Sequence, residues 1–102
     1  MERARVTEAK HILGVIRSAQ AQYYAQYYQY TTSLSDLGLE DLAGPDASKF
    51  FNYTGFYDDY WVGRAVRKVV SLPPGFVVYR VTIAEDGYMF IQPNTTQYNK
   101  LL

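Results

Sequence analysis

The chain has 102 residues, with ten basic and ten acidic side chains and no cysteine, so its formal net charge at neutral pH is zero. The charge balance excludes a global attraction to nucleic acid or anionic lipid, and the lack of cysteine excludes disulfides, thiolate metal sites and thiol nucleophiles. The length fits one domain, and 48 % apolar with 20 % charged residues is a globular rather than a disordered composition.

Residues 2–30 contain no proline and predict one long helix. Apolar positions recur at steps of three and four, interrupted only by Gln20, which indicates a single buried stripe along an amphipathic helix. The predicted packing stripe comprises Val6, Ala9, Leu13, Ile16, Tyr23, Tyr27 and Tyr30.

Residues 31–49 are dense in Ser, Thr, Asp, Gly and Pro and predict a connecting loop with local turns. The following segment, residues 50–92, is rich in aromatic and β-branched residues and predicts four antiparallel strands. The expected strands are 50–57, 60–70, 76–84 and 88–92, followed by a tail at 93–102. The chain is therefore expected to be a single α+β domain, with one long N-terminal helix packed on the sheet.

The third expected strand has the clearest two-residue period. Val77, Tyr79, Val81 and Ile83 alternate with their neighbours and predict one face turned to the core. The turn Glu85-Asp86-Gly87 after it predicts a hairpin, because Gly87 can adopt positive φ.

Several runs are similar to one protein family. The runs ARVTEAK (4–10), ILGVIRSAQ (12–20) and AQYYA (21–25) resemble the point in type IV pilins and type II secretion pseudopilins where the long first helix leaves the membrane. The run YTTSLSDLG (30–38) is similar to the family's connecting loop. Residues 48–53 and 79–87 look like its first strand and its later hairpin. The resemblance covers most of the chain and is specific in the first half.

Two features depart from the family pattern. Many members break the helix ahead of the Tyr-Thr pair, whereas residues 26–29 here continue an aromatic, helix-compatible run. Many also close their C-terminal region with a disulfide, which a cysteine-free chain cannot form. The subfamily, pilus or secretion pseudopilus, is therefore left open.

The resemblance implies a structural filament subunit, assembled through its helix with further copies and with other pilin-like subunits. It also implies a precursor in which a leader and about 25 apolar residues precede this region and anchor it in the inner membrane before assembly. The expected location is an extracellular filament or the periplasm. The alternative is a minor or tip subunit that recognises DNA or a surface, and an unrelated adaptor or inhibitor domain forms a third class.

One expected strand carries the candidate partner or DNA contact. Aromatic rings can stack on bases, and basic groups can hold phosphates. The candidate residues are Tyr60, Trp61, Arg64, Arg67 and Lys68, with Arg64 and Lys68 on one face. The competing interpretation, which we favour, is an ordinary outward strand face.

No residue pattern predicts catalysis. The single histidine, His11, lies within the expected helix, and neither a Gly-x-Ser-x-Gly elbow nor a glycine-rich phosphate loop is present. Glu40, Asp41 and Asp46 could supply oxygen ligands to calcium, but they lack EF-hand spacing. We therefore expect no enzymatic activity, no cofactor and no metal. The tyrosines between 23 and 30 are expected to serve packing and subunit contact rather than electron transfer.

Overall fold

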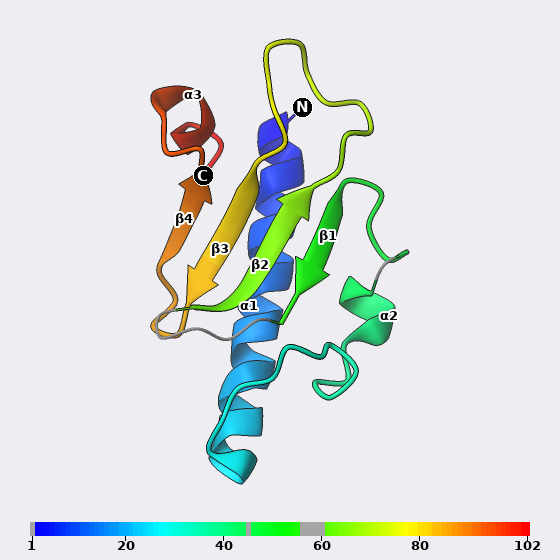
Figure 1. Ribbon diagram of the computed structural model, residues 1–102, viewed down its shortest axis with the longest axis vertical. Helices are drawn as coiled ribbons and strands as arrows, with labels where there is room; N and C mark the ends of the chain where they lie inside the picture. Colours follow the sequence, from blue (N-terminus) through cyan, green and yellow to red (C-terminus); the bar gives the residue numbers. More distant parts are fainter. Residues whose placement is uncertain (1, 45, 56–60) are drawn as a thin grey trace.

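The protein is an α+β domain in which one long helix covers one face of a four-stranded antiparallel sheet (Figure 1). The computed structural model describes residues 2–44, 46–55 and 61–102. Its elements are α1 (Glu2–Tyr27), α2 (Glu40–Ala43), β1 (Phe51–Thr54), β2 (Trp61–Arg67), β3 (Arg80–Ala84), β4 (Met89–Gln92) and α3 (Thr96–Asn99). The strands lie in sequence order, and each pairs antiparallel with the next. The predicted fold class is confirmed.

The core lies between α1 and the inner face of the sheet. Val6, Ala9, Leu13 and Ile16 of α1 are fully buried, as a stripe with helical spacing requires. β2 approaches the helix closely at Gly63, where an added Cβ would lie 2.9 Å from Cγ2 of Ile16. Glycine at this position therefore lets the strand backbone reach the helix surface.

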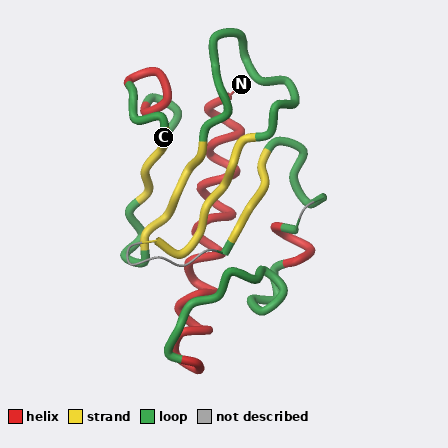
Figure 2. Tube along the Cα trace, viewed as in Figure 1, coloured by secondary structure: helices red, strands yellow, loops and turns green. Residues whose placement is uncertain are grey.

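The helix does not continue to Tyr30 as predicted, although Tyr30 packs against the core from the loop after α1. α1 ends at Tyr27, and Tyr28 takes a left-handed conformation with φ of 58° while its N–H donates to the Tyr24 carbonyl at 2.8 Å. This is the geometry of a helix C-terminal cap, and it turns the chain back toward the sheet. Tyr27 is 57 % exposed because the last turns of α1 extend beyond the sheet (Figure 2).

Gln20, the apparent interruption of the stripe, is itself fully buried. Its amide nitrogen donates to the carbonyls of Thr31 and Val62 at 2.7 and 3.0 Å, and its amide oxygen accepts from the Thr31 N–H at 3.1 Å. One side chain thereby fastens the connecting loop and β2 to α1. Helical spacing does not reveal this role, because a buried glutamine with all its hydrogen bonds made does not differ in sequence from an exposed one.

The observed strands are shorter than the expected ones. The third begins at Arg80 rather than residue 76, and Val77 is exposed while Tyr79, Val81 and Ile83 are buried. The backbone N–H of Val77 bonds to the Tyr98 hydroxyl at 2.9 Å instead of a strand partner. The predicted connecting loop and tail contain the short helices α2 and α3, and residues 56–60 of the expected first two strands lie outside the described part. Among the described residues, no helix combines the length and the hydropathy that crossing a membrane requires.

Candidate functional site

The outer face of the sheet, opposite α1, carries part of the predicted contact surface. Strand register places Arg64 of β2 beside Thr82 of β3, which in turn faces Phe90 of β4. The Arg64 guanidinium lies 4.0 Å from the centre of the Trp61 ring, and its Nε donates to the Thr82 hydroxyl at 3.1 Å. The structure therefore brings Trp61 and Arg64 together as a stacked cation–aromatic pair.

Arg67 does not belong to this surface, and its prediction as a contact residue is wrong. It is 1 % exposed and lies on the inner face of β2, because side chains alternate along a strand and Arg67 is an odd number of residues from Arg64. Lys68 follows the strand and donates to the Ser48 carbonyl at 2.7 Å. Tyr60, the remaining predicted contact, lies outside the described residues.

Arg67 instead belongs to a buried polar cluster with Glu2 and Tyr79. Its Nε and Nη2 donate to the two carboxylate oxygens of Glu2 at 2.6 and 3.1 Å, which is a bidentate pair. Its Nη1 donates to the carbonyls of Lys68 and Val70, and the Tyr79 hydroxyl donates to Glu2. The cluster therefore joins the first turn of α1 to the end of β2 and the approach to β3.

The electrostatics of this buried cluster agree with an ion pair. Burial raises the pKa of the Glu2 carboxyl, but hydrogen bonds from Arg67 and Tyr79 outweigh burial and leave that pKa below its usual range. The hydrogen bond with Glu2 raises the pKa of Arg67 despite burial, and burial together with Glu2 raises the pKa of Tyr79 well above its usual range. Every polar group of the cluster is satisfied within the fold, so its role is structural.

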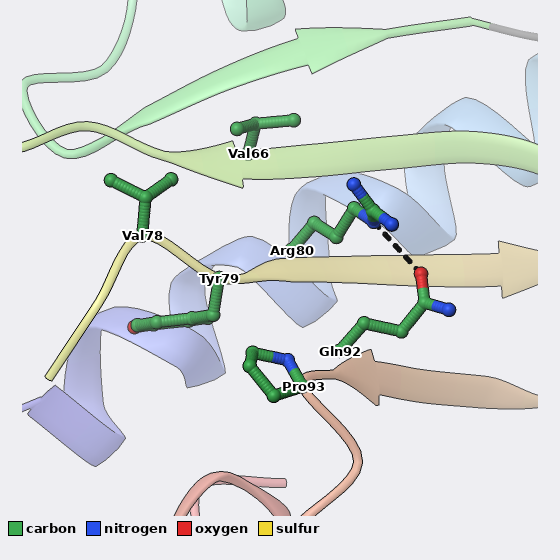
Figure 3. A pocket seen from close by; sticks show the side chains of 6 residues that line it. All are labelled: Val66, Val78, Tyr79, Arg80, Gln92 and Pro93. Atoms are coloured by element: carbon green, nitrogen blue, oxygen red, sulfur yellow. Dashed lines mark hydrogen bonds between the residues drawn. The ribbon is translucent and has the colours of Figure 1, made fainter.

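A hollow of about 250 Å³ opens beside β3, lined by Val66, Val78, Tyr79, Arg80, Gln92 and Pro93 (Figure 3). The Nε of Arg80 donates to the amide oxygen of Gln92 at 2.8 Å across it, and the Tyr79 ring points away toward α1. The lining offers a guanidinium and an amide, with no nucleophile paired to a base. The hollow is a depression on the outer side of the sheet.

The acidic residues weighed as calcium ligands lie near one another. Glu40, Asp41 and Asp46 line one shallow depression around α2. Even so, within residues 2–44, 46–55 and 61–102 no group of three His, Cys, Asp or Glu side chains is placed to hold a metal ion. His11 is exposed on α1.

Tyrosines gather at the end of α1. Tyr23 lies against Tyr27 with ring centres 4.5 Å apart, and Tyr24 lies against Tyr30 at 4.9 Å. The Tyr30 hydroxyl donates to the Glu85 carboxylate at 2.8 Å; burial and this acceptor raise the Tyr30 pKa to about 12. The tyrosine cluster thus holds the loop after α1 against the β3–β4 turn.

Comparison of the chain with protein-family models, with curated proteins and with solved structures gives no match. Two surfaces remain as candidate sites: the outer sheet face around Trp61 and Arg64, and the exposed side of α1 with its tyrosine end. Both are suited to contact with a large partner rather than to the enclosure of a small molecule.

Proposed function

We propose that this protein is a structural subunit of a pilin-like filament that assembles through α1. The observation that carries the proposal is the projection of α1 past its own sheet, where Tyr24, Tyr27 and Tyr28 are exposed. Large aromatic side chains with a polar tip are typical of protein interfaces. The resemblance of the first half of the chain to pilins and pseudopilins supports the same role.

The helix has a second side that its own fold leaves uncovered. The sheet buries Val6, Ala9, Leu13 and Ile16, whereas the small and polar residues of the other side face solvent. The exposed residues of that side include Ala4, Thr7, His11, Ser18 and Gln22. Small side chains allow neighbouring helices to approach, and a repeated heterologous contact between such helices builds an open helical assembly.

In this proposal an apolar helical segment ahead of α1 anchors the subunit in the inner membrane before assembly. The globular domain then coats an extracellular or periplasmic filament, whose other members are copies of this chain or related subunits. A pilus and a secretion pseudopilus both fit the described geometry. The subunit has no catalytic role in either.

Cross-linking in the native cells tests the helix contact, because a chain without cysteine allows clean placement of single thiols. Thr7→Cys/Gln22→Cys puts two thiols on the exposed side of α1, about 22 Å apart along the helix and too distant to join within one molecule. The control, Asn52→Cys/Gln92→Cys, puts two thiols on the outer sheet face at opposite edges, about 14 Å apart, so the linker used must be shorter than this span.

With a bifunctional maleimide, the α1 pair is expected to give a ladder of covalent multimers in the sheared surface or periplasmic fraction. The outer-face pair is expected to remain monomeric. A ladder from the outer-face pair alone, or monomers from both, would refute assembly through α1.

The outer sheet face favours a second candidate function, in which a minor or tip subunit binds DNA or a surface. The supporting observation is the stacked pair of Trp61 and Arg64. Arg64→Ala tests it, whereas alanine at Arg67 would break the buried cluster. Lost binding with intact filaments supports the tip role, and unchanged binding contradicts it.

A further inference from the structure

The molecule has two distinct ends along its 44 Å long axis. At the first end, here called the start end, α1 begins, β2 and β4 finish, and the loop 68–79 and α3 lie beside them (Figure 1). At the opposite end, here called the tip end, α1 finishes and the connecting loop follows; the β3–β4 turn lies at the edge of the sheet that faces this end. α2 lies on the side of the molecule nearer the tip end.

The exposed charges are segregated between these ends although the whole chain is neutral. The start end carries exposed cations at the first turn of α1, ahead of β1, at the first residue of β3 and after α3. These cations are Arg3, Lys49, Arg80 and Lys100. Glu2 also lies at this end, but its carboxylate is neutralised by the ion pair with Arg67 in the buried cluster. Glu8 is the exposed carboxylate that departs from the pattern at this end.

The tip half carries the opposite sign. Its exposed carboxylates among the described residues lie in the connecting loop, on and just after α2, and in the β3–β4 turn: Asp36, Glu40, Asp41, Asp46, Glu85 and Asp86. In the part of the chain that the structure describes, Arg17 is the cation among them, and its Nε donates to the Glu85 carbonyl at 2.9 Å. Among the described residues, exposed cations therefore gather toward the start end and exposed carboxylates toward the tip half, although the whole chain has no net charge.

Each end also exposes apolar side chains. The start end exposes four valines in the loop between β2 and β3: Val69, at 73 %, with Val70, Val77 and Val78. The end of α1 exposes Tyr24, Tyr27 and Tyr28, of which Tyr28 is 82 % exposed, and Tyr88 is exposed beside the β3–β4 turn. An apolar patch rimmed by charge is typical of a protein interface.

Of the three ways in which two copies can meet end to end, one brings opposite charges together and covers the exposed apolar side chains of both ends. Start against start or tip against tip brings like charges together, and the 44 Å axis prevents the two ends of one molecule from meeting. Start against tip joins opposite charges and covers valines with tyrosines. Such a contact is heterologous, so it leaves a free end on each partner and repeats.

We propose that the start end of one copy binds the tip end of a second copy of this chain. The inference rests on the proposed filament role, to which it adds a charge-paired contact between globular domains. It is nevertheless testable apart from that role, because it concerns the behaviour of the purified chain in solution.

Sedimentation velocity of the purified chain over a concentration series provides the test. Association is expected at about 0.05 M NaCl, and its constant is expected to fall about tenfold or more at 0.5 M, because salt screens charges between molecules. Lys49→Glu/Lys100→Glu removes most of the positive charge of the start end, and Glu40→Lys/Asp41→Lys removes most of the negative charge of the tip half, so neither variant keeps the charge difference between its ends. Each variant alone is expected to stay monomeric, whereas an equimolar mixture of the two is expected to associate.

Glu8→Lys is the control, since it reverses an exposed carboxylate on the side of α1, and it is expected to associate at least as well as the parent chain. Circular dichroism and urea midpoints verify folding, and Lys100→Glu and Asp41→Lys replace any double variant that does not fold. A parent chain that stays monomeric at low salt, variants that associate like the parent, or a mixture that stays monomeric would each overturn the proposal. If the purified chain shows salt-sensitive association but the α1 thiol pair gives no cross-links in cells, the contact between the two ends stands and only the filament assembled through α1 is refuted.

Discussion

Replacing Glu2 by glutamine tests the buried cluster most directly. The substitution keeps the shape of the side chain but removes the charge that faces Arg67, whose guanidinium stays buried in the fold. Removing one member of a buried ion pair costs about 3–5 kcal/mol, since the other charge is left without its partner. Because glutamine still offers one acceptor oxygen, we expect a loss near the lower limit, about 3 kcal/mol of unfolding free energy.

Urea denaturation and thermal unfolding measure this loss. For a domain of this length, about 3 kcal/mol corresponds to a fall in melting temperature of at least about 12 °C. Glu8→Gln removes an exposed carboxylate from the same helix and is expected to change stability by no more than about 0.5 kcal/mol. In the double variant Glu2→Gln/Arg67→Met, the total loss is expected to be smaller than the sum of the two single losses.

The pH dependence supplies an independent check with a defined sign. The folded pKa of Glu2 lies below its ordinary value of 4.5, so the carboxylate stabilises the fold fully above that value. This contribution is lost as pH falls from 4.5 through the lower folded pKa. The stability gap between the parent chain and Glu2→Gln is therefore expected to shrink in acid. A loss below about 1 kcal/mol at neutral pH, or a gap independent of pH, would refute the ion-pair reasoning.

Two further substitutions address α1 and its end. Gln20→Leu leaves the Thr31 N–H and the Thr31 and Val62 carbonyls without their partner, so urea denaturation should show a loss of about 1–3 kcal/mol; an unchanged midpoint would contradict this. Tyr28→Gly removes the cost of a left-handed tyrosine, and the same assay should show a gain of up to about 1 kcal/mol, whereas a clear loss would show that its ring stabilises the fold.

The regular parts of the fold follow from local patterns. Helical spacing predicts the burial of Val6, Ala9, Leu13 and Ile16, because the sheet covers the helix along that length. The same spacing fails at Tyr27, since the extent of the sheet is a tertiary property that no helix pattern contains. The alternation of the third strand likewise holds from Tyr79 onward and fails at Val77, whose N–H bonds to the distant Tyr98.

Sequence patterns could not predict which polar side chains are buried. Gln20 and Arg67 look like surface residues by composition, yet both are buried because partners far along the chain satisfy them. The sequence does offer one local signal for Arg67. Arg67 lies three residues after Arg64 in β2, and an odd spacing along a strand places two side chains on opposite faces of the sheet. Its acidic partner, 65 residues away, could be found only from the fold. Of the predicted contact residues, Trp61 and Arg64 therefore remain on the candidate surface, whereas Arg67 is buried and Lys68 donates to a loop carbonyl.

The two ends of α1 are held in different ways. The ion pair of Glu2 with Arg67 ties the first turn to the end of β2, whereas the last turn, with Tyr27 exposed, extends past the sheet. Between them, the side chain of Gln20 holds the connecting loop and β2. The helix is therefore expected to fray from its last turn as far as Gln20 before its first turn separates from β2.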